Sequence, residues 1–290
     1  ITHIKDKNIK FVTISESNHR SYTSHTFHYK LVKALYENKI INTFSSERLG
    51  INDGEIINYY IKNQLDIDAM IKNLPFGGLG FYRIVKYLYK KPFKNFKIVG
   101  LEEDKYCPKS MKGLPKDFVS SSYTVSKTRE EFWLKNIIKT IEERGNLFIN
   151  GFHLSKKDLI GKYLLKNYPD QTLILSMSAL EITTQVLIID DKIKDLTAAI
   201  MVDNYKMKVE NIKKIAPPTD FEKKHDDWKL IKVTEKNKKE KFRAVGCYLA
   251  VYDNEYKEGI DITDEISYKL KNYDYVIFFK KSVYKEKMLS

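Results

Sequence analysis

Short apolar runs alternate with amphipathic stretches along the first two thirds of the chain. The runs are rich in β-branched and aromatic residues, which is typical of buried strands. The stretches between them carry apolar residues three and four positions apart, which is typical of helices that pack on a sheet. The pattern predicts five strands in this part of the chain, at 9–14, 40–44, 96–99, 147–150 and 172–176.

The amphipathic stretches predict one helix after the first, third and fourth strands and two helices after the second strand. In the first helix, His28 lies one turn before Val32 and Leu35 on the apolar stripe, so we expect His28 to pack in the core. Asn52 or Asp53 can cap the second helix. The predicted helices lie at 22–38, 52–63, 82–89, 128–144 and 157–167, the third following a Gly-rich break.

Strand and helix alternate through five strands, which favours an α/β fold with a mostly parallel central sheet and helices on both faces. Residues 102–127 contain Pro, Gly and Ser with little periodicity, and they are predicted to form a long lid loop over the sheet edge. The last third is less regular, with strands expected at 186–189, 244–251 and 275–279. We expect a single domain over 1–290 with a charged excursion around 206–241, a stretch that could instead be a basic partner-binding arm.

Ionisable residues follow the ends of the first four predicted strands. In an open parallel sheet the carboxyl ends of the strands share one edge, where ligand sites form. We therefore expect these residues to converge, with Glu16, His19, Glu47 and His153 lining one cleft. In strand order they are Glu16 and His19, Glu47 and Arg48, Glu102, and His153.

A histidine in such a cleft suits hydrolysis by water. An imidazole with an ordinary pKa of about 6.5 can take a proton from water at neutral pH. His19 fits that role, with Glu16 or Glu47 fixing its tautomer, and Arg48 or His153 could stabilise the oxyanion that forms on a carbonyl. No Gly-x-Ser-x-Gly sequence occurs, which favours direct attack by water over an acyl-enzyme.

The same residues also have purely structural interpretations. His19 can be satisfied by backbone groups at a helix N-terminus, and His153 can cap its helix. Glu47 and Arg48 can form an ion pair that closes a loop. Glu102 can belong to a solvated loop.

Seven short motifs occur in an order that is informative as a set. They are Glu16-Ser17-Asn18-His19, Ser46-Glu47-Arg48, Ile57-Asn58-Tyr59-Tyr60, Gly100-Leu101-Glu102, Arg129-Glu130-Glu131-Phe132, Asn150-Gly151-Phe152-His153 and Tyr273-Asp274-Tyr275-Val276-Ile277. This order and its rough spacing resemble the erythromycin esterase family over nearly the whole chain. Three positions depart from the family pattern: Ser15 replaces a Gly, Glu102 replaces an Asp and Asn150 replaces a His.

The resemblance implies a hydrolase of carboxylic esters or lactones that needs no cofactor. It implies catalytic roles for the strand-end residues and substrate binding by Glu102, Arg129 and Asn150. The wider superfamily also contains metal-dependent proteases and haem-uptake proteins, so two alternatives stay open. One is metal-assisted hydrolysis with Zn or Mn, whose ligands would be Glu16, His19, Glu47 and His153. The other is a non-catalytic binding protein with a basic surface.

The chain has 51 Lys and Arg against 38 Asp and Glu, which gives a net charge of +13. This charge has little effect on the kind of binding partner that we expect. Most of it comes from Lys, which we expect on a solvated surface. A small-molecule ester or lactone is therefore the expected partner, and the charge alone does not exclude nucleic acid.

The remaining features concern redox chemistry and location. Cys107 and Cys247 lie far apart without a Cys-x-x-Cys motif, and we interpret both as unpaired thiols. No apolar run is long enough to span a membrane. A cytoplasmic location is favoured, while the start at Ile1 leaves secretion after removal of a leader open.

Overall fold

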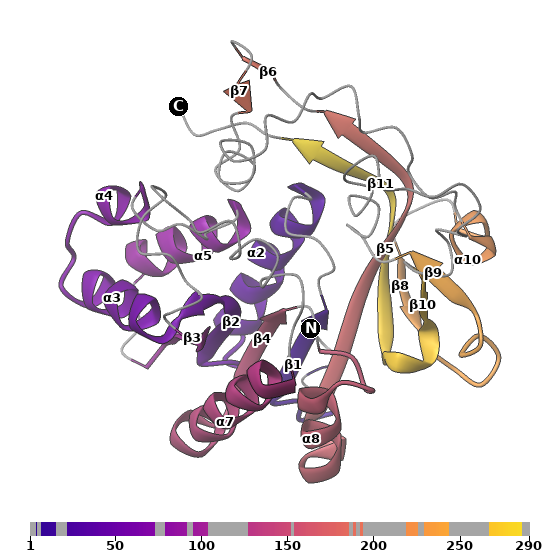
Figure 1. Ribbon diagram of the computed structural model, residues 1–290, viewed down its shortest axis with the longest axis horizontal. Helices are drawn as coiled ribbons and strands as arrows, with labels where there is room; N and C mark the ends of the chain where they lie inside the picture. Colours follow the sequence, from indigo (N-terminus) through magenta and orange to yellow (C-terminus); the bar gives the residue numbers. More distant parts are fainter. Residues whose placement is uncertain are drawn as a thin grey trace. The chain divides into compact units, whose positions relative to one another are not determined.

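The computed structural model describes Ile4 and residues 7–15, 22–72, 79–91, 95–103, 127–151, 154–185, 188–189, 192–193, 219–225, 229–243 and 267–285. The chain divides into two compact units (Figure 1). The first comprises 1–14 and 25–173, and the second comprises 15–24 and 174–290. The expectation of a single domain over 1–290 stays a prediction.

The first unit contains strands in the order β3-β2-β4-β1. Their bounds are Lys97–Glu102, Thr43–Gly50, Leu147–Gly151 and Phe11–Ser15. β2 pairs in parallel with both β3 and β4. The carboxyl ends of these three neighbouring strands therefore lie at the same edge of the sheet.

Helices cover both faces of this sheet (Figure 1). On one face lie α7 (Lys127–Arg144) and α8 (Leu159–Asn167). Trp133 and Ile137 of α7 and Leu164 of α8 are buried in one apolar cluster with Leu147 and Ile149 of β4. Burial of this many large apolar side chains, at roughly 1.5–3 kcal/mol each, is the main force that holds the two helices on the sheet.

The opposite face is covered by α2 (Tyr22–Glu37), α3 (Ile51–Lys62) and α5 (Leu79–Lys90). The ring of Phe44 in β2 lies 6.0 Å from the ring of Phe81 in α5, measured between centroids. His28 of α2 is buried, as predicted. The α/β fold with a mostly parallel sheet and helices on both faces is thus confirmed. The predicted lid falls on 102–127, of which 104–126 lie outside the described residues.

Two boundaries near β2 differ from the prediction. The strand was expected at 40–44, but β2 runs from Thr43 to Gly50. The apolar pattern ended the strand too early because Ser45, Ser46 and Glu47 are polar, although they are buried at 0, 4 and 7% exposure. The cap of α3 was also wrong: Gly50 is the N-cap, and the carboxylate of Asp53 accepts a hydrogen bond from the Gly50 amide at 3.3 Å. The short helix α4 (Ile67–Lys72) was not predicted.

The outer edge of β3 is covered by α3. Gly54 makes this close approach possible, since a Cβ there would lie 2.7 Å from the Gly100 nitrogen. The Asn58 side chain then donates to the Ile98 carbonyl at 2.6 Å and accepts from the Ile98 amide at 2.9 Å. These two bonds replace those of a neighbouring strand at an edge that would otherwise invite pairing with another chain.

Replacement of Asn58 by alanine is expected to lower the free energy of unfolding by at least about 2 kcal/mol. Ile98 is fully buried, and a buried donor or acceptor left without a partner costs about 1–3 kcal/mol. Asn63→Ala is the matched control, because Asn63 donates only to the exposed Tyr59 carbonyl. Urea unfolding of both variants checks the prediction, and equal losses would contradict it.

The second unit contains strands in the order β5-β11-β8. β11 (Tyr275–Lys285) pairs in parallel with β5 (Thr172–Gln185) and antiparallel with β8 (Lys229–Lys232). Both long strands continue well beyond the predicted 172–176 and 275–279. The predicted strand at 244–251 lies outside the described residues, and so do 186–187 of the one at 186–189.

Five short elements complete the second unit. The charged stretch 206–241, in which no element was predicted, contains α10 and β8 and the start of β9. The short elements are β6 (Ile188–Ile189), β7 (Lys192–Ile193), α10 (Asp220–Lys223), β9 (Lys241–Arg243) and β10 (Ser267–Lys269).

None of the described helices is both long and apolar enough to cross a membrane.

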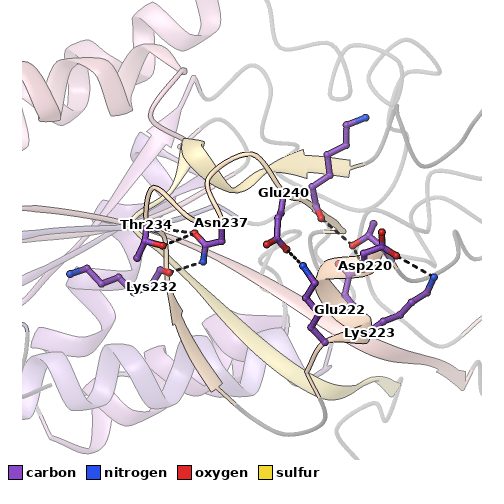
Figure 2. Close-up of polar contacts among 10 residues, drawn as sticks. Asp220, Glu222, Lys223, Lys232, Thr234, Asn237 and Glu240 are labelled. Atoms are coloured by element: carbon purple, nitrogen blue, oxygen red, sulfur yellow. Dashed lines mark hydrogen bonds and ion pairs between the residues drawn. The ribbon is translucent and has the colours of Figure 1, made fainter.

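Polar side chains fasten this charged stretch to the unit (Figure 2). Asn237 accepts from the Thr234 amide at 2.8 Å and donates to the Lys232 carbonyl at 3.0 Å, which closes the turn after β8. Glu222 in α10 is fully buried and accepts from the hydroxyl of Ser178 in β5 at 3.0 Å. Thr219, the N-cap residue of α10, donates to the same carboxylate through its backbone amide and its hydroxyl. A buried carboxylate with several donors is a satisfied structural group.

Candidate functional site

Three of the candidate side chains lie at the carboxyl ends of neighbouring strands. Glu102 is the last residue of β3, Glu47 lies in the second half of β2, and Asn150 lies near the end of β4. Ser46 is in register with both Gly100 and Asn150. The parallel pairing therefore brings Glu47, Glu102 and Asn150 to one edge of the sheet, as predicted for the ends of parallel strands.

Two glycines leave the space that this edge needs. A Cβ on Gly151 would lie 2.5 Å from Oε2 of Glu47, so the missing side chain is what gives the carboxylate its place. The pairing of β2 with β3 becomes irregular between Ser46 and Gly50. There the chain passes over Gly100, where a Cβ would lie 2.7 Å from the Leu49 carbonyl oxygen.

Glu102 and Arg129 form an ion pair at this edge. Oε2 of Glu102 accepts from Nε of Arg129 at 2.6 Å and also from its Nη2. The Glu102 side chain is 1% exposed and that of Arg129 is 12% exposed. The guanidinium lies 5.0 Å from the ring centroid of the buried Trp133, close enough for a cation–π contact. The first turn of α7 is thereby tied to the end of β3.

Asn150 contacts α2. Its Nδ2 lies 3.2 Å from Nδ1 of His28, whose residue is 2% exposed. Burial lowers the pKa of His28 to about 3, because an apolar interior disfavours the charged ring. His28 is therefore neutral at physiological pH.

The other candidates fall outside what the structure describes. Glu16, His19 and His153 lie outside the described residues, and of Arg48 only the backbone is described. The single cleft therefore stays a prediction. Within the described ranges, no three His, Cys, Asp or Glu side chains lie close enough together to hold a metal ion. The Zn or Mn site, three of whose four ligands are among the undescribed residues, also stays a prediction.

Sequence reasoning missed two contributors to this edge. His28 was expected in the core, and its helical spacing indicated that much, but nothing in the spacing pointed to Asn150. Gly151 was quoted only as part of a motif, although a glycine directly after the strand-end Asn150 is the kind of signal that marks a close approach.

The comparisons with known proteins identify the fold. No protein-family model matches this chain, and no curated protein matches its sequence. A protein from Bacillus cereus with a solved structure shares 12% identity with it over 99% of this chain and 93% of its own, with a TM-score of 0.58. A succinoglycan biosynthesis protein shares 12% identity over 97% of this chain and 90% of its own, with a TM-score of 0.51.

A third structure is a mutant of the erythromycin esterase EreC in its open conformation. It shares 9% identity over 96% of this chain and 92% of its own, with a TM-score of 0.57. Identities this low show similarity of fold and do not transfer an activity. The chain therefore has a fold that it shares with an erythromycin esterase over nearly its whole length.

Proposed function

We propose that this protein is a hydrolase of the erythromycin esterase type, in which water attacks a carboxylic ester or lactone of a small molecule. The observation that carries the proposal is the convergence of Glu47, Glu102 and Asn150 at the ends of three neighbouring strands. The shared fold with an erythromycin esterase supports it. Active sites of open α/β sheets form at this edge.

In the proposed mechanism, His19 takes a proton from the attacking water. Glu47, only 7% exposed, is suited to accept a hydrogen bond from an imidazole and so to stabilise the imidazolium that forms, and Glu16 is the other candidate for this role. Arg48 or His153 stabilises the negative charge on the carbonyl oxygen. The protonated His19 then gives its proton to the leaving alcohol, which closes the cycle without a covalent intermediate.

Glu102 and Arg129 were both predicted to bind substrate, and in the proposed function they do so as the ion pair that they form with each other. Each holds the other in one orientation at the edge of the sheet, so the pair would present a fixed dipole. Such a pair can orient a polar group of a substrate, although it cannot neutralise an anion as a lone arginine would.

Metal-assisted hydrolysis is the alternative within the enzyme class. Carboxylate and imidazole groups of the kind found in Glu16, His19, Glu47 and His153 suit Zn or Mn. A bound metal would activate the water, and the same four side chains would then be ligands. Loss of activity on chelation, with recovery on adding Zn or Mn, separates the two mechanisms.

The test is a screen of esters and lactones with the purified protein, its metal content and a pair of variants. Glu47→Gln is expected to lower turnover by roughly 10- to 100-fold, since a hydrogen bond to a charged group contributes about 1.5–3 kcal/mol. Glu55→Gln is the control, because Glu55 of α3 is exposed and forms its ion pair with Lys97 of β3.

Each outcome of the screen has a distinct meaning. Turnover that falls with Glu47→Gln and persists with Glu55→Gln supports the proposal. Absence of turnover on every ester and lactone, together with tight binding of an anionic polymer, would favour the non-catalytic alternative. Parental turnover by Glu47→Gln would remove Glu47 from the mechanism.

A further inference from the structure

His28 joins a helix on one face of the sheet to a strand end at the candidate site. It is buried at 2% exposure in α2, and its Nδ1 lies 3.2 Å from Nδ2 of Asn150, which is 122 positions away in sequence. Asn150 is the residue before Gly151, against which the Glu47 carboxylate packs. A buried imidazole thus contacts the residue that precedes the glycine against which the proposed catalytic carboxylate packs.

The protonation state of His28 decides what this contact can be. A neutral imidazole has one N–H donor and one bare nitrogen, whereas an imidazolium has two donors and no acceptor. The amide nitrogen of Asn150, a donor, faces Nδ1 of His28, and this arrangement fits the neutral tautomer in which Nδ1 is the bare nitrogen and Nε2 carries the proton. The lowered pKa of His28, about 3, keeps the ring in that neutral form across physiological pH.

The geometry of an amide then fixes the rest. Its nitrogen and oxygen point in directions about 120° apart on one planar carbon, so an amide that turns its nitrogen to His28 directs its oxygen elsewhere. Without the imidazole, the amide could turn over and present either atom. A bare Nδ1 accepts only from the amide nitrogen, so the contact between His28 and Asn150 holds the amide in the orientation that the structure has.

We infer that His28 is a positioning residue, which holds the Asn150 amide so that its carbonyl oxygen serves as a hydrogen-bond acceptor at the carboxyl end of β4. This inference rests on the proposed function, because in that function the Asn150 oxygen accepts a hydrogen bond from a group that takes part in the reaction. The attacking water and a substrate hydroxyl are donors of this kind. Asn150 would bind neither a carboxylate nor a phosphate through this oxygen.

Nuclear magnetic resonance of 15N-labelled protein tests the orientation without any substrate. The His28 ring is expected to stay neutral from pH 5 to 8 with Nδ1 bare, and Asn150→Leu is expected to shift the Nδ1 resonance. In His28→Leu, the protected side-chain amide proton of Asn150 should exchange with solvent much faster. A His28 ring that titrates near pH 6.5, or an Nδ1 resonance unmoved by Asn150→Leu, overturns the inference.

Kinetics test the consequence on any ester or lactone that the parental protein hydrolyses. His28→Leu is expected to lower kcat by about fivefold with KM unchanged within about twofold, as for one neutral hydrogen bond lost in the transition state. His28→Gln should recover most of kcat, because its carbonyl can accept from the amide. Asn150→Leu should lower kcat about as much as the double variant does.

Val32→Ala is the control for packing, since Val32 lies one turn further along α2 and is 1% exposed. It should lower the midpoint of thermal unfolding and leave kcat unchanged. Additive effects of His28→Leu and Asn150→Leu on kcat would overturn the positioning role while leaving hydrolysis intact. If the parental protein hydrolyses no ester or lactone but the resonances behave as expected, the proposed function fails and the orientation of Asn150 by His28 stands.

Discussion

Replacement of His19 by alanine is expected to lower turnover of an ester or lactone by about 10²- to 10⁴-fold, the usual contribution of a general base. The reason is that water is a poor nucleophile until a neighbouring group takes its proton. The binding constant for substrate should change little, since the residue acts on the water. Steady-state kinetics of the parental protein and His19→Ala provide the measurement.

The pH dependence of the parental enzyme gives the same residue a second test. A general base works only when unprotonated, so turnover should fall as the pH drops below the imidazole pKa, ordinarily about 6.5. His225→Gln is the control, because His225 packs against the rings of Phe221 and Phe278 in the second unit. If His19→Ala works at the parental rate, His19 is not the base; recovery of a chelated enzyme by Zn or Mn would make it a ligand instead.

Replacement of Arg129 by methionine is expected to lower the free energy of unfolding by about 3–5 kcal/mol. Glu102 is 1% exposed, and removing one partner of a buried ion pair leaves an uncompensated charge in the interior. The cation–π contact with Trp133 is lost as well. Urea unfolding followed by Trp133 fluorescence, in a Trp228→Phe background that leaves one reporter, measures the change in the first unit.

Two further variants test whether the uncompensated charge of Glu102 causes the loss of stability. Lys139→Met removes an exposed ion pair of the same helix, with Glu143 at 3.8 Å and both side chains more than half exposed, and should cost less than about 1 kcal/mol. The double variant Glu102→Leu with Arg129→Met should recover much of the stability, because replacing a whole buried pair by apolar groups is often neutral. Equal losses from Arg129→Met and Lys139→Met would contradict the prediction.

Local patterns of apolar residues placed most of the first unit correctly. The helix at 128–144 and the strand at 147–150 differ by a residue from α7 and β4, because their periods depend only on which side chains face the core. The pattern failed at the end of β2, where buried polar residues replace apolar ones. It also missed α4, which is only six residues long.

The candidate site was likewise predicted only in part from the sequence. Placing Glu47, Glu102 and Asn150 at one edge needs only that the strands are parallel, which the alternation of strand and helix already indicates. The partners of these side chains could not be foreseen. Arg129 and Glu102 were each expected to bind substrate, and no local pattern indicated that they pair with each other.

Amino-acid order alone thus specifies the strands, the helices and the edge at which the polar residues gather, because these depend on periodicities within about twenty residues. Tertiary structure decides which side chains and backbone groups come into contact. Asn58 reaches Ile98 across 40 positions and His28 reaches Asn150 across 122, and no local period links residues so far apart. Such contacts depend on how closely the elements approach one another. Gly54 allows the close approach of α3 to β3, Gly100 that of β2 to β3, and Gly151 leaves room for the Glu47 side chain.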